Sequence, residues 1–138
     1  MRPLLDTNVL VDVALTRPGL HAASGATVAW CLNNPGAGLL AIHSLATLSY
    51  LAGKAAGQVK AREFLADLIE GMDIARMDNA EVRRALSLPL TDFEDSLVVA
   101  AAESAGATHI VTRNIADFRR SPVKAVLPEE FLRLVARI

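Results

Sequence analysis

The sequence is poor in several of the features that identify whole classes of protein. It has one cysteine, Cys31, which excludes an internal disulfide and a pair of thiols for a metal site. No apolar run reaches the roughly 18 residues that a membrane-spanning helix needs, because charged or amide side chains interrupt every such run. The opening Met-Arg-Pro-Leu-Leu-Asp has no long apolar segment of the kind found in secretory signals. We therefore expect a cytoplasmic protein with no membrane partner.

Aromatic residues and net positive charge are also scarce. Aromatics make up 4% of the chain, so the core is expected to consist of Ala, Leu, Val and Ile. The net charge of −1 differs from the strongly basic balance of many nucleic-acid-binding domains. Any contact with nucleic acid must then depend on local groups, such as a bound metal ion or a basic rim made by Arg113, Arg119 and Arg120.

What the sequence does contain indicates one globular domain over residues 1–138. Hydrophobic residues make up 52% and charged residues 21%, and no linker or repeat divides the chain. Strands are expected at 3–5, 39–42, 73–76, 109–112 and 123–126, and helices at 8–15, 20–32, 44–54, 59–70, 79–86, 92–104 and 129–138. This alternation predicts an α/β fold with a central, mostly parallel sheet. In such folds functional groups gather at the carboxyl ends of the strands.

Asp6 follows the first expected strand directly. A carboxylate at a strand end is well placed to bind a divalent cation, but Asp is also a favourable N-cap for the helix that follows. For Asp6 alone, both interpretations stay open.

The segment 90–95, Leu-Thr-Asp-Phe-Glu-Asp, carries more information. Thr91 and Glu94 have the spacing of a capping box, which predicts Thr91 as the N-cap. Glu94 is explained by the helix dipole alone. Asp92 and Asp95 lie three residues apart on one helical face, and Asp95 adjoins an apolar stripe. Two such carboxylates repel each other unless a cation or proton lies between them.

The third acidic position follows the expected strand at 109–112, where Arg113, Asn114 and Asp117 lie on the next loop. Asn114 alone is an ordinary turn residue. Taken with Asp6 and Asp95, however, Asp117 makes three acids at strand or helix ends, which favours a shared site. Carboxylate and water oxygens suit Mg²⁺ or Mn²⁺, which can activate water against a phosphodiester.

The remaining candidate side chains are assigned structural roles. His43 could contact phosphate or metal, but a role as a helix cap or a solvent-facing side chain is favoured. His21 and His109 have no acidic or thiol partners at zinc-ligand spacing. Trp30 and Tyr50 are expected in the core, although isolated aromatics can also stack on bases.

Four segments together resemble the PIN-domain family, in its VapC-like toxin ribonuclease branch. They are Leu-Leu-Asp-Thr-Asn at 4–8, Thr-Asp-Phe-Glu-Asp at 91–95, Ile-Val-Thr-Arg-Asn-Ile-Ala-Asp-Phe at 110–118 and Val-Leu-Pro-Glu-Glu-Phe-Leu at 126–132. Each segment is weak evidence by itself. Their order and spacing through nearly the whole chain make the combination specific.

The resemblance implies a three-layer α/β/α sandwich and an Mg²⁺- or Mn²⁺-dependent endoribonuclease, often the toxin of a toxin–antitoxin pair and often a homodimer. It implies that Asp6, Asp95 and Asp117 are catalytic and bind the metal. Supporting roles fall to Asn8, which would orient Asp6, and to Thr112 and Asn114. RNA would be the substrate, and an antitoxin protein the partner.

One feature departs from the family pattern. Most active PIN nucleases carry a glutamate in the helix after the second strand, but residues 43–50 contain no acid, and Ser49 stands about where the glutamate would be. A subset of the family shares this pattern. Our hypothesis is that Asp92 supplies the missing charge as a further metal ligand. The alternative is a PIN-fold module with weakened catalysis that binds RNA or protein.

A different class of enzyme also begins with a strand-end aspartate. Phosphatases of the haloacid-dehalogenase kind place a second aspartate two residues after the first, whereas this chain has Asn8 there. That difference disfavours a phosphoryl-enzyme mechanism.

Overall fold

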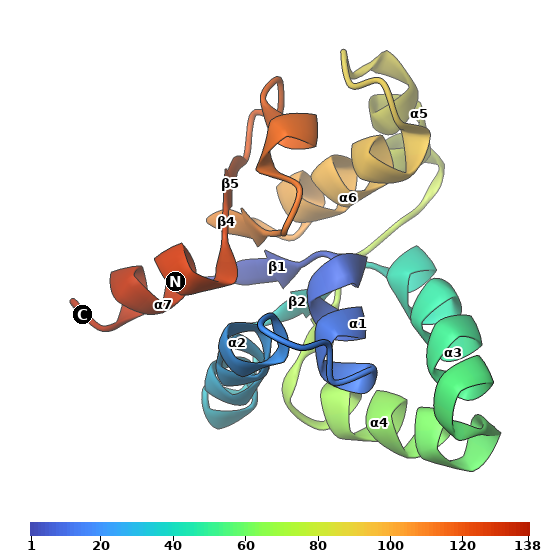
Figure 1. The fold of residues 1–138 in the computed structure, drawn as a ribbon. Helices are drawn as coiled ribbons and strands as arrows, with labels where there is room; N and C mark the ends of the chain where they lie inside the picture. The colour runs from blue at the N-terminus through green and yellow to red at the C-terminus, as the bar shows by residue number, and fades with distance from the viewer.

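The computed structural model describes residues 1–138 and contains one five-stranded sheet. The strands are β1 (Pro3–Leu5), β2 (Leu39–Leu40), β3 (Asp73–Ile74), β4 (His109–Val111) and β5 (Lys124–Val126). Their order across the sheet is β3-β2-β1-β4-β5, and every neighbouring pair is parallel (Figure 1). The α/β fold with a parallel sheet, predicted from the alternation of elements, is confirmed.

Seven α-helices and one short 3₁₀ helix connect the strands. They are α1 (Thr7–Ala14), α2 (His21–Asn33), α3 (Ile42–Ala56), α4 (Gln58–Gly71), α5 (Asn79–Ser87), α6 (Phe93–Ser104), α7 (Pro128–Val135) and the 3₁₀ helix η1 (Ile115–Phe118). Between α3 and α4 only Gly57 intervenes, at φ 90°, a conformation that suits a residue without a Cβ. None of these helices combines the length and the apolar character needed to cross a membrane.

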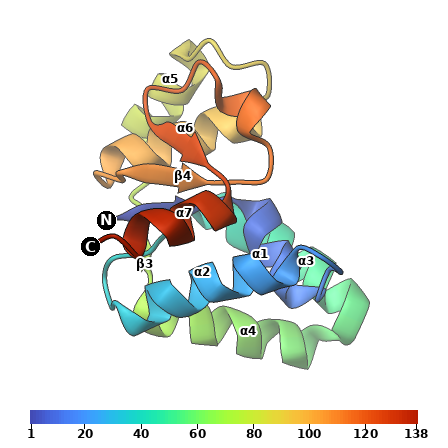
Figure 2. The same cartoon turned by 60° about the vertical axis from the view of Figure 1, so that its left-hand side comes forward.

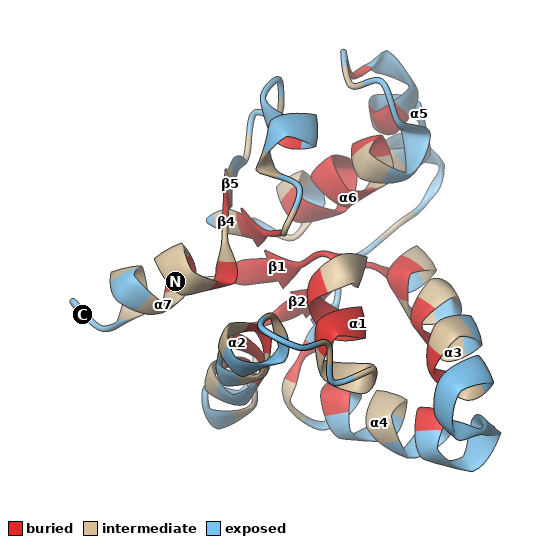
Figure 3. Cartoon of the chain, viewed as in Figure 1, coloured by how far each residue is buried: buried red, intermediate tan, exposed pale blue.

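The helices cover both faces of the sheet, because successive strand residues point to opposite sides. Leu5, Leu40 and Val111 pack on one side with residues of α1, α2, α3, α4 and α7. Leu4, Leu39 and Ile110 pack on the other side with α6, against which α5 lies. Figures 2 and 3 show these layers and the buried residues that line them. The three-layer α/β/α sandwich is therefore confirmed.

Several element boundaries differ from the sequence-based expectation. The strand expected at 39–42 ends at Leu40, because Ile42 already begins α3. Thr91, expected as the N-cap, lies outside the next helix. Asp92 takes that place because its carboxylate accepts a hydrogen bond from the Asp95 amide at 3.1 Å. Residues 115–118, expected as an open loop, form η1, which buries Phe118 in the core.

The topology places a crevice beside β1. From β1 the chain proceeds outward to β2 and β3, then returns across the sheet to β4 on the other side of β1. The strand order thus reverses between β1 and β4, and ligands of open α/β sheets bind at the carboxyl ends of strands at such a reversal. Asp6 follows β1 and Thr112 follows β4 at this point.

Candidate active site

Asp6 lies at the reversal point with its carboxylate nearly enclosed, at 6% exposure. One oxygen accepts a hydrogen bond from the Thr7 amide at 2.8 Å, which makes Asp6 the N-cap of α1. The other accepts from the Thr112 hydroxyl at 2.8 Å and from the Asn8 side-chain amide at 3.3 Å. Burial raises the pKa of Asp6 above its ordinary value, although the hydrogen bonds from Thr112 and Thr7 oppose that rise.

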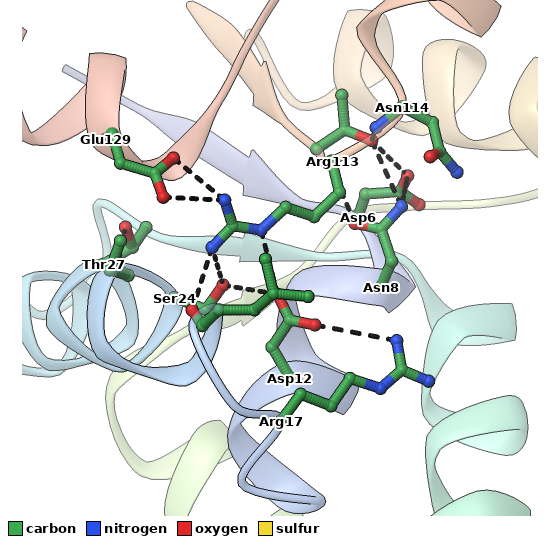
Figure 4. Close-up of polar contacts among 12 residues, drawn as sticks. Asp6, Asn8, Asp12, Arg17, Ser24, Thr27, Arg113, Asn114 and Glu129 are labelled. Atoms are coloured by element: carbon green, nitrogen blue, oxygen red, sulfur yellow. Dashed lines mark hydrogen bonds and ion pairs between the residues drawn. The ribbon is translucent and has the colours of Figure 1, made fainter.

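Thr112 and Asn8 connect Asp6 to the loop after β4. The Thr112 hydroxyl, which donates to Asp6, also accepts from the Asn114 amide at 3.0 Å. The Asn8 side-chain carbonyl accepts from the Arg113 amide at 3.1 Å. Asn8, which Figure 4 shows beside Asp6, and Thr112 therefore lie where a role in orienting Asp6 requires them.

Asp92 and Asp95 approach Asp6 from the N-terminus of α6. Asp92 is the N-cap of this helix, and Asp95 lies in its first turn. The pKa of Asp95 is raised to about 7 by burial and then by the negative charges of Asp6, Asp92, Asp117 and Glu94, in that order of effect. Four other carboxylates from three parts of the chain therefore act on one aspartate.

Two clefts meet at these acids. The first, of about 300 Å³, is lined by Asp6, Asn8, Asn114, Asp92, Asp95 and Asp117, together with Thr7, Val11, Arg17, Leu51 and Glu94. The second, of about 440 Å³, shares Asp92, Asp95 and Asp117 with the first and extends to Arg119 and Arg120. Apart from Thr112, which is buried behind Asp6, every predicted site residue lines one cleft.

The donor set suits a hard divalent cation, which prefers carboxylate and water oxygens. Asp6 accepts three hydrogen bonds, and a carboxylate has about four acceptor positions, so room for a cation remains. The acidic side chains are not arranged so that three of them could hold one ion as they stand. Mg²⁺ commonly uses only one or two protein carboxylates and completes its shell with water.

Helix α3 contributes no acid to the cleft. Leu51 is its only lining residue, and Ser49 does not line the cleft. His43, at the start of α3, was expected to cap a helix or face solvent, and this expectation is wrong. Both of its ring nitrogens are buried without a hydrogen-bond partner. Burial lowers the pKa of His43, while the negative charges of Glu94 and Asp6 oppose that shift.

The basic groups near the site are arranged differently from the expectation. Arg113 is not part of a basic rim, because its guanidinium points away from Asp6 and binds Asp12 and Glu129 at 2.8–3.0 Å (Figure 4). Arg17, which no sequence pattern singles out, lines the cleft and lies 3.6 Å from Asp12. Glu94 was explained by the helix dipole alone, yet it also lines the cleft. Arg17 follows α1 and Glu94 lies in the first turn of α6, so the fold brings them to one cleft from distant parts of the chain.

Comparison with known proteins identifies the family. A sequence model of the PIN domain matches residues 2–116. Among curated protein sequences, none matches this chain.

Solved structures share the fold at low sequence identity. VapBC2 from Rickettsia felis, bound to a DNA fragment from its promoter, superposes with a TM-score of 0.70 at 19% identity and covers 92% of this chain and 98% of that one. A toxin–antitoxin complex from Klebsiella pneumoniae gives 0.70 at 20% identity, covering 91% and 97%. VapC20 from Mycobacterium tuberculosis, a toxin that cleaves the sarcin–ricin loop, gives 0.62 at 13% identity, covering 78% and 86%.

Proposed function

We propose that this chain, which belongs to the PIN domain family, is an Mg²⁺- or Mn²⁺-dependent endoribonuclease and the toxin of a toxin–antitoxin pair. The observation that carries the proposal is the convergence of Asp6, Asp92, Asp95 and Asp117 on one cleft. Burial and the charges of Asp6, Asp92, Asp117 and Glu94 raise the pKa of Asp95 to about 7. Such crowding of carboxylates is unfavourable unless a cation or protons compensate it.

Each acidic residue has a role in this proposal. Asp6 and Asp95 would hold the cation in the cleft that they both line, and Asp117 would complete the acidic lining. Asn8 and Thr112 fix the Asp6 carboxylate through the hydrogen bonds at 3.3 and 2.8 Å. When bound, the cation supplies polarisation of the scissile phosphate and lowers the pKa of an attacking water.

Asp92 supplies the negative charge that the family glutamate provides in other members. Its carboxylate accepts only the Asp95 amide hydrogen bond, at 3.1 Å, and lines both clefts. The alternative function, a PIN-fold module with weakened catalysis that binds RNA or protein, is favoured by one observation. Where α3 meets the cleft, the structure has Leu51 and no acid.

The substrate and partner belong to the same proposal. An RNA substrate is supported by the family match and by the sarcin–ricin-loop cleavage of VapC20. An antitoxin partner is supported by the toxin–antitoxin complex from Klebsiella pneumoniae. We extend the proposal to a cytoplasmic location and to a homodimer, whose mass sedimentation would measure.

The proposal is tested by incubating the purified chain with single-stranded and structured RNA in Mg²⁺, Mn²⁺ or EDTA. An Asp95→Asn variant keeps the side-chain shape but removes a ligand charge, and is expected to lose activity by at least about a hundredfold. Asp67→Asn, an exposed aspartate on α4, is the matched control and is expected to cleave like the unmodified chain. Metal-independent cleavage, or equal cleavage by Asp95→Asn, would contradict the proposal. If no metal supports cleavage, the alternative function, a PIN-fold module that binds RNA or protein, would be the one that remains.

A further inference from the structure

We propose that Arg119 and Arg120 form a phosphate-binding subsite that holds the RNA strand beside the acidic centre. This inference rests on the proposed function, because it assigns the path of that substrate. The two arginines line the cleft of about 440 Å³, which shares Asp92, Asp95 and Asp117 with the cleft around Asp6. A strand bound to the arginines therefore passes directly to the acids.

Both arginines are available for an anion. They are exposed, and neither forms any of the chain's seven salt bridges. Arg113, which precedes η1, is by contrast bound to Asp12 and Glu129. Arg119 and Arg120 share a cleft with three carboxylates and still remain unpaired, so their guanidinium groups keep the planar donor edge that suits phosphate.

The backbone that carries these arginines is held in place at both ends. Phe118, the residue before Arg119, is buried in the core at 3% exposure. The Ser121 amide donates to the Phe118 carbonyl at 3.0 Å, and the Ser121 hydroxyl donates to the Val123 carbonyl at 2.7 Å. The arginine pair is therefore presented from a fixed turn, which reduces the conformational entropy lost when an anion binds.

The lining of the cleft favours a nucleic-acid strand over an acidic peptide. Apart from Pro89, Leu90 and Ala116, the lining side chains are polar or charged, so the cleft has little apolar surface for peptide side chains. The cleft around Asp6 also continues past the shared acids to Arg17. Arginine therefore lines both of the clefts that contain the acids, although Arg17, unlike Arg119 and Arg120, is paired with Asp12.

The test measures binding, so that it does not depend on cleavage. A fluorescein-labelled single-stranded RNA of about 12 nucleotides is titrated with the full chain in EDTA at several salt concentrations, and anisotropy gives the affinity. Arg119→Ala/Arg120→Ala is expected to bind about tenfold more weakly. The slope of log affinity against log salt should also become shallower by about 1.4, since each phosphate contact to a single strand contributes about 0.7.

The matched control is Arg133→Ala/Arg137→Ala, two exposed arginines on or beside α7 that form no salt bridge. It removes the same charge and is expected to leave affinity and slope unchanged. Equal weakening by both double variants, or none by Arg119→Ala/Arg120→Ala, would overturn the subsite. Displacement of the RNA by poly-glutamate as effectively as by unlabelled RNA would overturn the choice of ligand. Failure of the proposed nuclease function appears separately, as absence of cleavage by the unmodified chain in Mn²⁺.

Discussion

The pKa of Asp95 reflects the burial and the negative charges of the surrounding site. The folded-state pKa of about 7 lies above the ordinary value of 3.8, so the folded protein favours the protonated form. Stability from this group is fully present below about pH 4 and is lost as pH rises toward 7. Because the side chain is only partly buried, we expect the loss to be about 1–2 kcal/mol, less than full conversion of the shift would give.

This yields a prediction for the metal-free protein. Asp95→Asn removes the titrating group, and its unfolding free energy in EDTA should exceed that of the unmodified chain by about 1 kcal/mol at pH 8. At pH 4 the two should be nearly equal. Urea unfolding across this pH range measures both, with Asp67→Asn as the control for loss of a surface carboxylate. A difference that does not change with pH would contradict the assigned environment of Asp95.

The sequence was sufficient to predict that some of the cleft-lining residues lie together and insufficient for others. Asp6, Asp95 and Asp117 were selected because each lies at a strand or helix end, and parallel strands bring their ends to one edge. Arg17 and Glu94 were missed because their proximity to Asp6 depends on how separate helices pack. The sequence predicts a cap or a solvent-facing role for His43, because no local pattern indicates that its ring is buried.

Among the elements, α6 combines a structural and a chemical role at one residue. Asp92 caps the helix by accepting the Asp95 amide hydrogen bond, and its charge is proposed to replace the family glutamate. The sequence predicted a capped helix here but assigned the cap to Thr91, since Thr91 and Glu94 fit a capping box equally well. The side-chain geometry shows that Asp92, and not Thr91, is the N-cap, and sequence spacing carries no information about that geometry.

The two roles of Asp92 can be separated by substitution. Asp92→Asn keeps a good N-cap, so thermal or urea unfolding should change by only a few tenths of a kcal/mol. Asp92→Ala should lose about 1 kcal/mol in addition. Both variants should weaken Mn²⁺ binding to a similar degree, because both remove the charge. If Asp92→Asn binds Mn²⁺ like the unmodified chain, Asp92 acts only as a cap.

Arg113 joins the sheet to three helices and so connects distant parts of the chain. Its guanidinium binds Asp12 of α1 at 3.0 Å, the Leu20 carbonyl and the Ser24 hydroxyl at the start of α2, and Glu129 of α7. Asp12 is fully buried, whereas Glu129 is 42% exposed. Asp12 lies 101 residues away along the chain, which is why the sequence indicated only a basic loop residue.

Removal of Arg113 is expected to destabilise the fold strongly. Arg113→Met leaves Asp12 buried without its principal cation, which should cost about 3–5 kcal/mol of unfolding free energy. Glu129→Gln removes only the partly exposed pair and should cost less than about 1 kcal/mol. Urea unfolding compares the two variants directly. A similar loss for both would mean that the buried Asp12 contact does not dominate the stability of this network.

The proposed chemistry requires that Asp6 and Asp95 hold one divalent cation in the cleft that Asp117 also lines. Titration calorimetry of the purified chain with Mn²⁺ tests this requirement without reference to any RNA. We expect one binding site in the unmodified chain and in Asp67→Asn, with affinity at least about tenfold lower in Asp95→Asn. Absence of Mn²⁺ binding, or equal affinity in Asp95→Asn, would contradict the metal site and with it the proposed chemistry.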